Sequence, residues 1–414
     1  MRIYLDHNAG APLRPEVRAA VARFCETDEA SNPAAVHRSG QRARRALEQA
    51  REQVAHFIGA AAREVVFTSG GTESNNLAIR GIAGANPARH RIVTSAIEHS
   101  SILAPLEYLA GYGFEVVRLA PDRDGRITPA AVAAALDDDT ALVTMGLANA
   151  EVGTIQDVAA MAERVARAGA LFHIDAAQAA GRSPLRVGDL RCDLLTISGH
   201  KLGAPAGIGA LYVRAGVALA PAMLGGPQEA AMRAGTPNLL GAIAFGVASE
   251  AADAHLADES ARVAMLAAGL LERLGASIPD LRLNGPKTVQ MSVPMTDPKT
   301  DSTIDRIGNT LNLTFPGVLG ESMLIALDLE GVEVSMGSAC AAGAVEPSHV
   351  LLAMGLTRDE ARSSLRLSLG WSTTADEIER AAEIIARVWR RVRAAEPLNA
   401  IGSARTAAVA EASR

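Results

Sequence analysis

The sequence predicts an α/β protein, with a mainly parallel, doubly wound sheet in a large domain and a smaller α+β domain. Three observations carry this prediction. Short apolar runs alternate with helical patterns, each run ends in polar or small residues, and a long Ala- and Leu-rich segment precedes a second group of strand signals. At 414 residues, the chain is long enough for one large core and one smaller core. A small binding module is therefore not expected.

Short apolar runs rich in β-branched and aliphatic residues are the expected strands of the large domain. In open α/β sheets, ligands bind outside the carboxyl ends of the strands. The polar residues that follow these runs are therefore the first candidates for chemistry. In chain order, the runs are Glu64–Thr68, Arg91–Ser95, Ala141–Met145, Ala170–Ile174 and Asp193–Ile197.

The second half of the chain predicts a connecting helix and a second domain. The helix is expected over Gly246–Leu274, and strand signals resume at Leu311–Phe315. The stretch from Asn284 to Asn309 is rich in Pro, Asp, Lys and Thr, which predicts a surface loop or insertion. The expected units are a large domain over residues 14–257, a small domain over residues 1–13 and 258–396, and a disordered tail over residues 397–414.

Charge and hydropathy exclude several classes of function. The net charge is −6, the pI is near 5.9, and the Arg-rich stretch Gln41–Arg51 is interrupted by Glu48, so no basic surface for nucleic acid is expected. The N-terminal residues are polar almost from the start and offer no signal-peptide core. We expect a cytoplasmic protein without a membrane or nucleic-acid partner.

The three cysteines, Cys25, Cys192 and Cys340, are widely spaced and form no CxxC pair. This pattern argues against a disulfide framework and against a metal site. Cys340 lies among the small residues of Ser335–Ala344, just before Glu346–Leu352, which resembles the start of a helix. A free cysteine is most often a small core residue, but a flexible loop of small residues favours a nucleophile.

The sharpest local signal is Lys201, which follows an expected buried strand in the run Ser198-Gly-His-Lys. A lysine at the end of a strand is placed to form a Schiff base with a carbonyl. A lone lysine is more often a solvated loop residue. The neighbouring motifs favour the Schiff-base interpretation.

Two further strand ends supply groups that a pyridoxal phosphate (PLP) cofactor requires. Asp175 ends the run Leu171–Asp175 and is placed to keep a pyridine nitrogen protonated. Taken alone, it would more often be a helix N-cap. Gly71 and Thr72 lie in the turn Thr68–Asn75, where backbone N–H groups can approach a phosphate. A plain strand-to-helix turn explains that glycine pair equally well.

His99, in Glu98-His-Ser, follows the next expected strand. Its imidazole can stack on a cofactor ring and exchange protons near neutral pH. A lone histidine at such a position would usually be structural. Its place in the series of strand ends favours a role in the site.

Taken together and in this order, these segments resemble the class V aminotransferase family, specifically the NifS/IscS-type cysteine desulfurases, across residues 2 to 395. The resemblance implies a fold-type I PLP-dependent transferase that forms a homodimer. In that arrangement Lys201 binds the cofactor aldehyde, Asp175 pairs with the ring nitrogen, and His99 stacks on the ring. The remaining implied cofactor contacts are Gln178 to the ring oxygen, Thr72, Ser198 and His200 to the phosphate, and Thr236 to the phosphate of the neighbouring subunit.

The same resemblance implies the substrate and the reaction. Arg366 matches the arginine that binds the substrate carboxylate, and its planar fork suits bidentate recognition. The Cys340 thiolate would take the sulfur of L-cysteine, leaving alanine and a persulfide. The segment from Glu321 to Pro347 resembles the group with an extended catalytic loop. Such a loop can carry sulfur to an acceptor protein for iron–sulfur clusters, tRNA thiolation or another pathway.

The chain also departs from the family pattern. It has Asn149-Ala150-Glu151 where Asn-Asn-Glu is usual, so Asn149 is the remaining candidate for the missing ring-oxygen contact. Adjacent residues of an extended segment point to opposite faces, so the replacement would need a local change of backbone geometry. The opening run Asp6–Pro12 and the run Glu229–Met232 also differ from the usual residues, and the Asn284–Asn309 stretch is longer than usual.

Two alternatives to a desulfurase therefore stay open. The departures at Ala150 and Gly10 are compatible with another class V aminotransferase or lyase in which Cys340 is incidental. Ala150 is also compatible with a weakly active scaffold that binds PLP and a sulfur-relay partner. The desulfurase ranks first, because it gives the cofactor groups and the nucleophile one common purpose.

Overall fold

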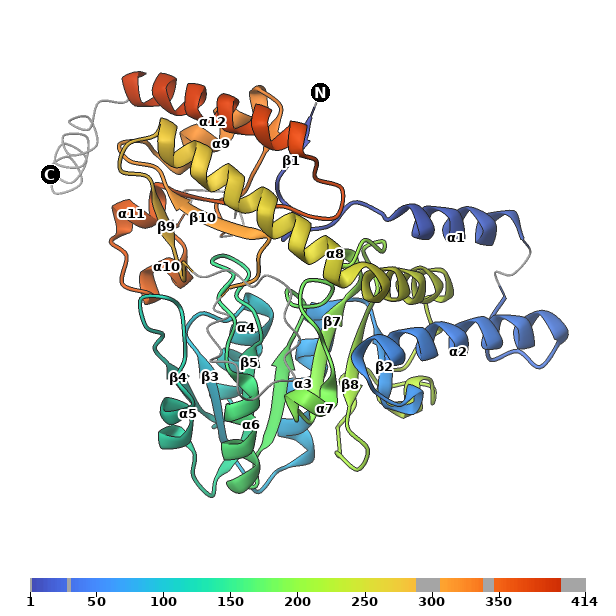
Figure 1. Ribbon diagram of the computed structural model, residues 1–414. Helices are drawn as coiled ribbons and strands as arrows, with labels where there is room; N and C mark the ends of the chain where they lie inside the picture. The colour runs from blue at the N-terminus through green and yellow to red at the C-terminus, as the bar shows by residue number, and fades with distance from the viewer. Residues whose placement is uncertain (1, 28–30, 288–305, 338–345, 396–414) are drawn as a thin grey trace, which may run out of the picture.

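The computed structural model describes residues 2–27, 31–287, 306–337 and 346–395. The larger sheet has seven strands in the order β2-β8-β7-β6-β5-β3-β4 (Figure 1). β8 runs antiparallel to both neighbours, whereas the other strand pairs of this sheet are parallel. The predicted α/β class and mainly parallel sheet are confirmed. The strands are β2 (Val65–Thr68), β3 (Arg91–Ser95), β4 (Glu115–Leu119), β5 (Thr140–Gly146), β6 (Leu171–Asp175), β7 (Leu194–Ser198) and β8 (Gly209–Val213).

Helices cover both faces of this sheet. Ile92 and Leu142 pack into the hydrophobic cluster under α3 and α4, whereas the next residues, Val93 and Val143, pack into the cluster under α2, α6 and part of α8. Successive side chains of a strand point to opposite faces, so a sheet covered on both sides needs continuous apolar runs. The helices up to this point are α1 (Pro15–Glu26), α2 (Arg38–Ile58), α3 (Gly71–Ala85), α4 (Ser100–Ala110), α5 (Pro129–Ala135), α6 (Val158–Arg167), α7 (Val187–Leu190) and α8 (Leu239–Ser277).

A close backbone approach joins β8 to the start of α3. Gly209 opposes both Thr68 of β2 and Ser198 of β7. A Cβ atom on Gly209 would lie 2.7 Å from the Cα of Gly70. Glycine at position 209 therefore allows the first turn of α3 to lie beside the carboxyl end of β7.

The smaller unit contains an antiparallel sheet of order β12-β10-β9 and a parallel pair, β1 with β11. An isolated bridge from Asp6 to Ser368 joins the N-terminal segment to β12, the edge of this sheet, and a second bridge links Ser335 to Arg366 of the same strand. Its elements are β1 (Ile3–Tyr4), β9 (Arg282–Asn284), β10 (Thr310–Thr314), α9 (Gly320–Leu329), β11 (Val332–Glu333), α10 (His349–Ala353), α11 (Arg358–Arg362), β12 (Ser364–Ser368) and α12 (Ala375–Ala395).

The 39-residue helix α8 belongs to both units. Its first half, including Phe245, packs into the core of the larger sheet, and its second half, including Leu270, packs with α9 and α12 (Figure 1). Within the described part of the chain, α8 alone has the length and apolar composition of a membrane span. Its apolar residues instead line two protein cores. The domain boundary expected after residue 257 falls inside α8 and stays a prediction.

Candidate functional site

Lys201, Asp175 and His99 lie near the carboxyl ends of strands of the larger sheet. Lys201 ends a short 3₁₀ turn, Gly199–Lys201, that follows β7 directly. Its Nζ donates hydrogen bonds to the backbone carbonyls of Asn8 and, at 2.9 Å, Ala9. Burial, aided by the positive charges of Arg182 and Arg366, lowers the pKa of Lys201 to about 7. A large fraction of this amine is therefore neutral, and so nucleophilic, near physiological pH.

Asp175 lies at the end of β6 and is held by two donors. Its Oδ2 accepts a hydrogen bond of 2.7 Å from Nδ2 of Asn75, and its Oδ1 accepts one of 2.9 Å from the backbone N–H of Ala177. Asn75 lies on α3 and is almost fully buried, and its Nδ2 also donates to Ser101 Oγ at 2.8 Å. These contacts fix the direction of the carboxylate. Asn75 was not predicted as a site residue.

His99 is the N-cap of α4, and its ring is fixed by that role. Nδ1 accepts a hydrogen bond of 3.1 Å from the backbone N–H of Ser101, and the Ser101 hydroxyl lies 2.7 Å from the same nitrogen. Burial lowers the pKa of His99, although the charge of Asp175 opposes this effect. The ring is therefore neutral, and the acceptor role of Nδ1 assigns the proton to Nε2.

A set of donors surrounds the first turn of α3. The N-cap is Gly70, and no side chain caps the helix, so the first backbone N–H groups, which include those of Gly71 and Thr72, keep their donor capacity. A Cβ atom on Gly71 would lie 3.6 Å from the Cβ of Ser198, which places the end of β7 beside this turn. Ser198 Oγ lies 3.0 Å from Nδ1 of His200. Burial lowers the pKa of His200 to about 4, so it is a neutral donor at physiological pH.

Gln178 connects this edge to the N-terminal segment. Its Nε2 donates to the carbonyl of Asn8 at 3.1 Å, and its Oε1 accepts from Nη1 of Arg182 at 2.8 Å. Arg182 also donates to the carbonyl of His7 at 3.1 Å. These contacts hold the amide of Gln178 near Lys201 through their shared partner Asn8.

Arg366 lies on β12 and is only 5% exposed. Its Nη2 donates to Oδ1 of Asp6 at 2.7 Å, and its Nη1 donates to the carbonyl of Ala150 at 3.3 Å. Its Nε is buried and has no hydrogen-bond partner among the residues that the structure describes. An unsatisfied donor on a buried guanidinium is costly, so it suits a site that is completed by an anion.

Asn149 uses its side chain within its own loop. Its Nδ2 donates to the carbonyl of Ile97 at 3.1 Å, and its Oδ1 accepts from the backbone N–H groups of Glu151 and Val152 at 2.9 and 3.1 Å. The contact with substrate or ring oxygen that we expected from Asn149 stays a prediction, and reaching such a ligand would require breaking this turn.

Two predicted site residues, Thr236 and Cys340, are left. Thr236 is exposed in the single chain, and its expected phosphate contact concerns a neighbouring subunit. Cys340 lies outside the described residues. Of the two cysteines within them, Cys25 is exposed on α1, and Cys192 is buried, with a pKa raised to about 12 by desolvation. A thiol with that pKa is inert as a nucleophile.

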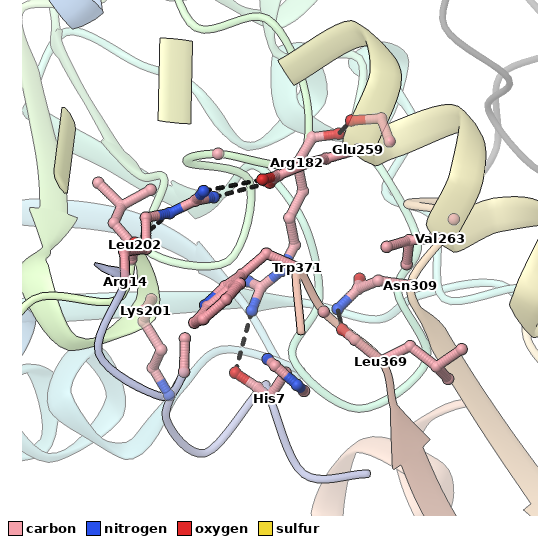
Figure 2. Close-up of a pocket in the computed structure, with 15 residues that line it drawn as sticks. His7, Arg14, Arg182, Lys201, Leu202, Glu259, Val263, Asn309, Leu369 and Trp371 are labelled. Atoms are coloured by element: carbon pink, nitrogen blue, oxygen red, sulfur yellow. Dashed lines mark hydrogen bonds and ion pairs between the residues drawn. The ribbon is translucent and has the colours of Figure 1, made fainter. Parts of the chain in front are cut away.

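A cavity of about 50 Å³ lies beside Lys201 (Figure 2). It is lined by His7, Arg182 and Trp371, and by Arg14, which forms an ion pair with Glu259 at 2.7 Å. Figure 2 shows Lys201 extending along the N-terminal segment at the cavity edge.

The donor set fits PLP. The first turn of α3, Ser198 and His200 supply phosphate donors, the fixed carboxylate of Asp175 suits a protonated ring nitrogen, and the amine of Lys201 has a lowered pKa. The cofactor would therefore be held at the carboxyl edge of β6 and β7, between His99 and Lys201.

Comparison with known proteins supports the same assignment. The family model described as "Aminotransferase class-V" matches residues 3–381. The chain is 39% identical over 396 residues to "Cysteine desulfurase IscS" of Dictyoglomus turgidum, covering 95% of this chain and 96% of that protein. It is 40% identical over 400 residues to "Cysteine desulfurase 2" of Trichormus variabilis, covering 96% and 95% of the two chains. The solved structure titled "NIFS-LIKE PROTEIN" matches with a TM-score of 0.84 and 30% identity, covering 94% of this chain and 99% of the other.

Proposed function

The chain belongs to the class V aminotransferase family, and on this premise we propose that it is a PLP-dependent cysteine desulfurase. Its substrate is L-cysteine, its amino-acid product is L-alanine, and the sulfur passes to Cys340 as a persulfide. The observation that carries the proposal is Lys201, a lysine with a lowered pKa at the end of β7, whose charge interacts with Asp175. The relatives named as cysteine desulfurases support the choice of substrate.

The bound cofactor supplies an electron sink for the carbanion chemistry of the substrate. Asp175, oriented by Asn75, keeps the proton on the ring nitrogen. The Nε2–H of His99 and the amine of Lys201 are the groups that hold or move protons beside the substrate. Arg366 binds the substrate carboxylate through its Nε–H, which no other described residue bonds.

The sulfur transfer balances without an external oxidant. The Sγ thiolate of Cys340 forms an S–S bond to the substrate sulfur while the substrate Cβ–S bond breaks. The electron pair of that bond stays with the substrate carbon, which takes up protons to become alanine. L-cysteine and a thiol thus become L-alanine and a persulfide.

Three finer features belong to this proposal. The enzyme acts as a homodimer, in which Thr236 of one subunit completes the phosphate site of the other. The persulfide is passed to an acceptor protein for iron–sulfur cluster, thio-cofactor or tRNA sulfur chemistry. The protein works in the cytoplasm, where thiols stay reduced.

The test follows alanine and sulfide from L-cysteine in the presence of PLP and a reductant, for the wild type and Cys340→Ala side by side. Alanine from the wild type alone is the expected result. Equal release by both proteins would instead indicate an aminotransferase or lyase. This outcome is worth testing because the Asn149 side chain, expected to contact the ligand, is hydrogen-bonded within its own loop. Release by neither would indicate the weakly active scaffold.

A further inference from the structure

The carboxyl group of Glu151 lies between two segments that are distant in sequence. Glu151 follows Ala150 in the loop after β5 and is only 5% exposed. Its Oε2 accepts a hydrogen bond of 2.6 Å from the hydroxyl of Ser348, which is the N-cap of α10. Ser348 also accepts the backbone N–H of Leu351 at 3.2 Å. One serine hydroxyl therefore ties the start of α10 to Glu151.

The same oxygen lies against Gly337. Gly337 has a φ of +88°, and a Cβ atom there would lie 2.5 Å from Oε2 of Glu151. Its N–H donates to Oγ of Ser335 at 3.2 Å, and Ser335 pairs with Arg366 through both backbone groups. Gly337 is thus held next to β12 on one side and against the Glu151 carboxyl on the other. Any larger residue at position 337 would displace that carboxyl.

Gly337 and Ser348 flank the segment of the sequence that carries Cys340. Cys340 follows Gly337 by three positions and precedes Ser348 by eight. The residue before Glu151, Ala150, offers its carbonyl to Nη1 of Arg366. Two consecutive residues, 150 and 151, therefore contact Arg366 and the two described residues that flank Cys340 in the sequence, Gly337 and Ser348.

Burying the carboxyl group of Glu151 costs stability, which favours a functional reason for its position. Burial raises the pKa of Glu151, and the hydrogen bond from Ser348 only partly offsets that effect. The charges of His349 and Arg366 favour the ionised form of Glu151. No ion pair within the described residues involves Glu151. A buried carboxyl group of this kind usually costs stability rather than adding to it.

We propose that Glu151 is a positioning residue for sulfur transfer, because its carboxyl group accepts a hydrogen bond from Ser348 and packs against Gly337. The inference rests on the proposed function, since it takes Cys340 as the nucleophile. Glu151 constrains the described residues that precede and follow Cys340 in the sequence, Gly337 and Ser348. It acts through these two neighbours and does not touch the reacting atoms.

The experiment compares Glu151→Ala, Glu151→Gln and Ser348→Gly with the wild type, with Glu163→Ala as a control on the exposed face of α6. Gln keeps an acceptor oxygen for Ser348, and Gly is tolerated at an N-cap, so the second and third variants are expected to fold. Two quantities are measured on the PLP-loaded enzymes. The affinity for L-cysteine is obtained from the change in cofactor absorbance in a Cys340→Ala background. The single-turnover rate of persulfide formation on Cys340 is obtained by mass spectrometry.

For Glu151→Ala and Ser348→Gly, we expect persulfide formation to slow on the order of 10²-fold, because a small misplacement of reacting groups has an effect of this size. The affinity for L-cysteine should stay close to that of the wild type. Glu151→Gln should recover most of the rate. An unchanged rate in Glu151→Ala, or an equal loss of cysteine affinity, overturns the inference.

A second readout does not depend on activity. In the apo-protein, amide hydrogen exchange of peptides containing Gly337 and Leu351 should accelerate in Glu151→Ala and stay near the wild-type rate in Glu151→Gln. If both peptides exchange as in the wild type, the tether is refuted. If the tether is present but the wild type forms no persulfide, the proposed function fails and the structural contact stands.

Discussion

The backbone carbonyl of Asn8 accepts a hydrogen bond from the ammonium of Lys201. The same carbonyl accepts from Gln178, while the side-chain Nδ2 of Asn8 donates to the Ala150 carbonyl at 3.0 Å and to Thr310 Oγ1 at 2.8 Å. Asn8 therefore links the reactive lysine of the larger sheet to the first residue of β10 in the smaller unit. The N-terminal segment is part of the site although it is far from Lys201 in sequence.

Replacing Asn8 by alanine should destabilise the fold. The change leaves Nδ2 of Asn309, which donates to Asn8 Oδ1 at 3.0 Å, without that partner in a buried position. We expect a loss of about 1–3 kcal/mol in the free energy of unfolding, the usual cost of an unsatisfied buried polar group. Urea unfolding measures it. Gln41→Ala, which removes an exposed hydrogen bond to Val36, is the matched control and should change stability little. Equal effects of the two changes would contradict the role of Asn8.

Cofactor attachment should follow the pKa of Lys201. Only the neutral amine attacks an aldehyde, so the rate of PLP uptake by the apo-protein should rise with pH and level off above about 7. A lysine with an ordinary pKa, near 10.4, would give a rate that keeps rising to much higher pH. Because the charge of Arg182 contributes to the lowered pKa, Arg182→Gln should move the midpoint upward. Stopped-flow absorbance measures both profiles, and a midpoint that stays fixed would count against this electrostatic coupling.

The orientation of Asp175 should matter as well as its charge. Asp175→Asn removes the carboxylate and should lower turnover on the order of 10²–10³-fold, as the loss of one preorganised electrostatic group does in other enzymes. Asn75→Ala leaves the charge but removes its 2.7 Å donor. We expect an intermediate loss of about 10- to 100-fold, the equivalent of a hydrogen bond to a charged group. Steady-state kinetics with L-cysteine distinguishes the two, and wild-type turnover in Asn75→Ala would show that the donor is dispensable.

Arg366→Lys should weaken substrate binding more than it slows chemistry. Lysine keeps the charge but loses the planar fork and the Nε–H, which has no partner within the described part of the chain. We expect KM for L-cysteine to rise by roughly tenfold or more, which corresponds to about 1.4 kcal/mol. Arg387→Lys, on the exposed face of α12, serves as the control. A rise in KM for both variants, or for neither, would remove Arg366 from the carboxylate site.

The ion pair between Arg51 and Glu229 should be a main determinant of stability. Glu229 is 3% exposed at its side chain, contacts Arg51 Nη1 at 2.6 Å, and accepts the backbone N–H of Phe67 at 2.8 Å. Removing one partner of a buried pair costs about 3–5 kcal/mol, so Glu229→Ala should unfold at a markedly lower denaturant concentration. Glu163→Ala, which breaks the exposed pair with Arg167, should change the free energy of unfolding by less than about 1 kcal/mol. Similar midpoints for the two variants would contradict this.

The sequence was sufficient to predict the elements with strong local signals. The predicted strands from Glu64 to Ile197 agree with β2, β3, β5, β6 and β7 to within about two residues, and the predicted connecting helix lies inside α8. β4 was not predicted, because as an edge strand it carries the exposed residues Glu115 and Arg118 and lacks a continuous apolar run. β8 was not predicted either, since its first residues follow a Gly- and Ala-rich stretch that indicates a loop.

The site was predictable where its residues follow strands, and unpredictable where contacts cross long distances in the sequence. Asp175 is the last residue of β6, and Lys201 and His99 follow within a few residues of the ends of β7 and β3. The partnership of Asn8 with Thr310 spans 302 positions, and nothing local in the opening run signals it. Asn75 could have been found, because it lies one turn after Gly71 on a helix that starts at the predicted phosphate turn. Its polar side chain on a buried helix face was the signal.

Because α8 contributes residues to both hydrophobic cores, we expect that neither core can unfold while the other stays folded. Unfolding the second half of the helix would remove Leu270 and its neighbours from the smaller core. The loss of helical structure would then extend towards Phe245, in the larger core. The molecule should therefore lose its structure in a single calorimetric transition, in spite of its two cores. Its calorimetric and van't Hoff enthalpies should agree as closely as those of a far smaller protein.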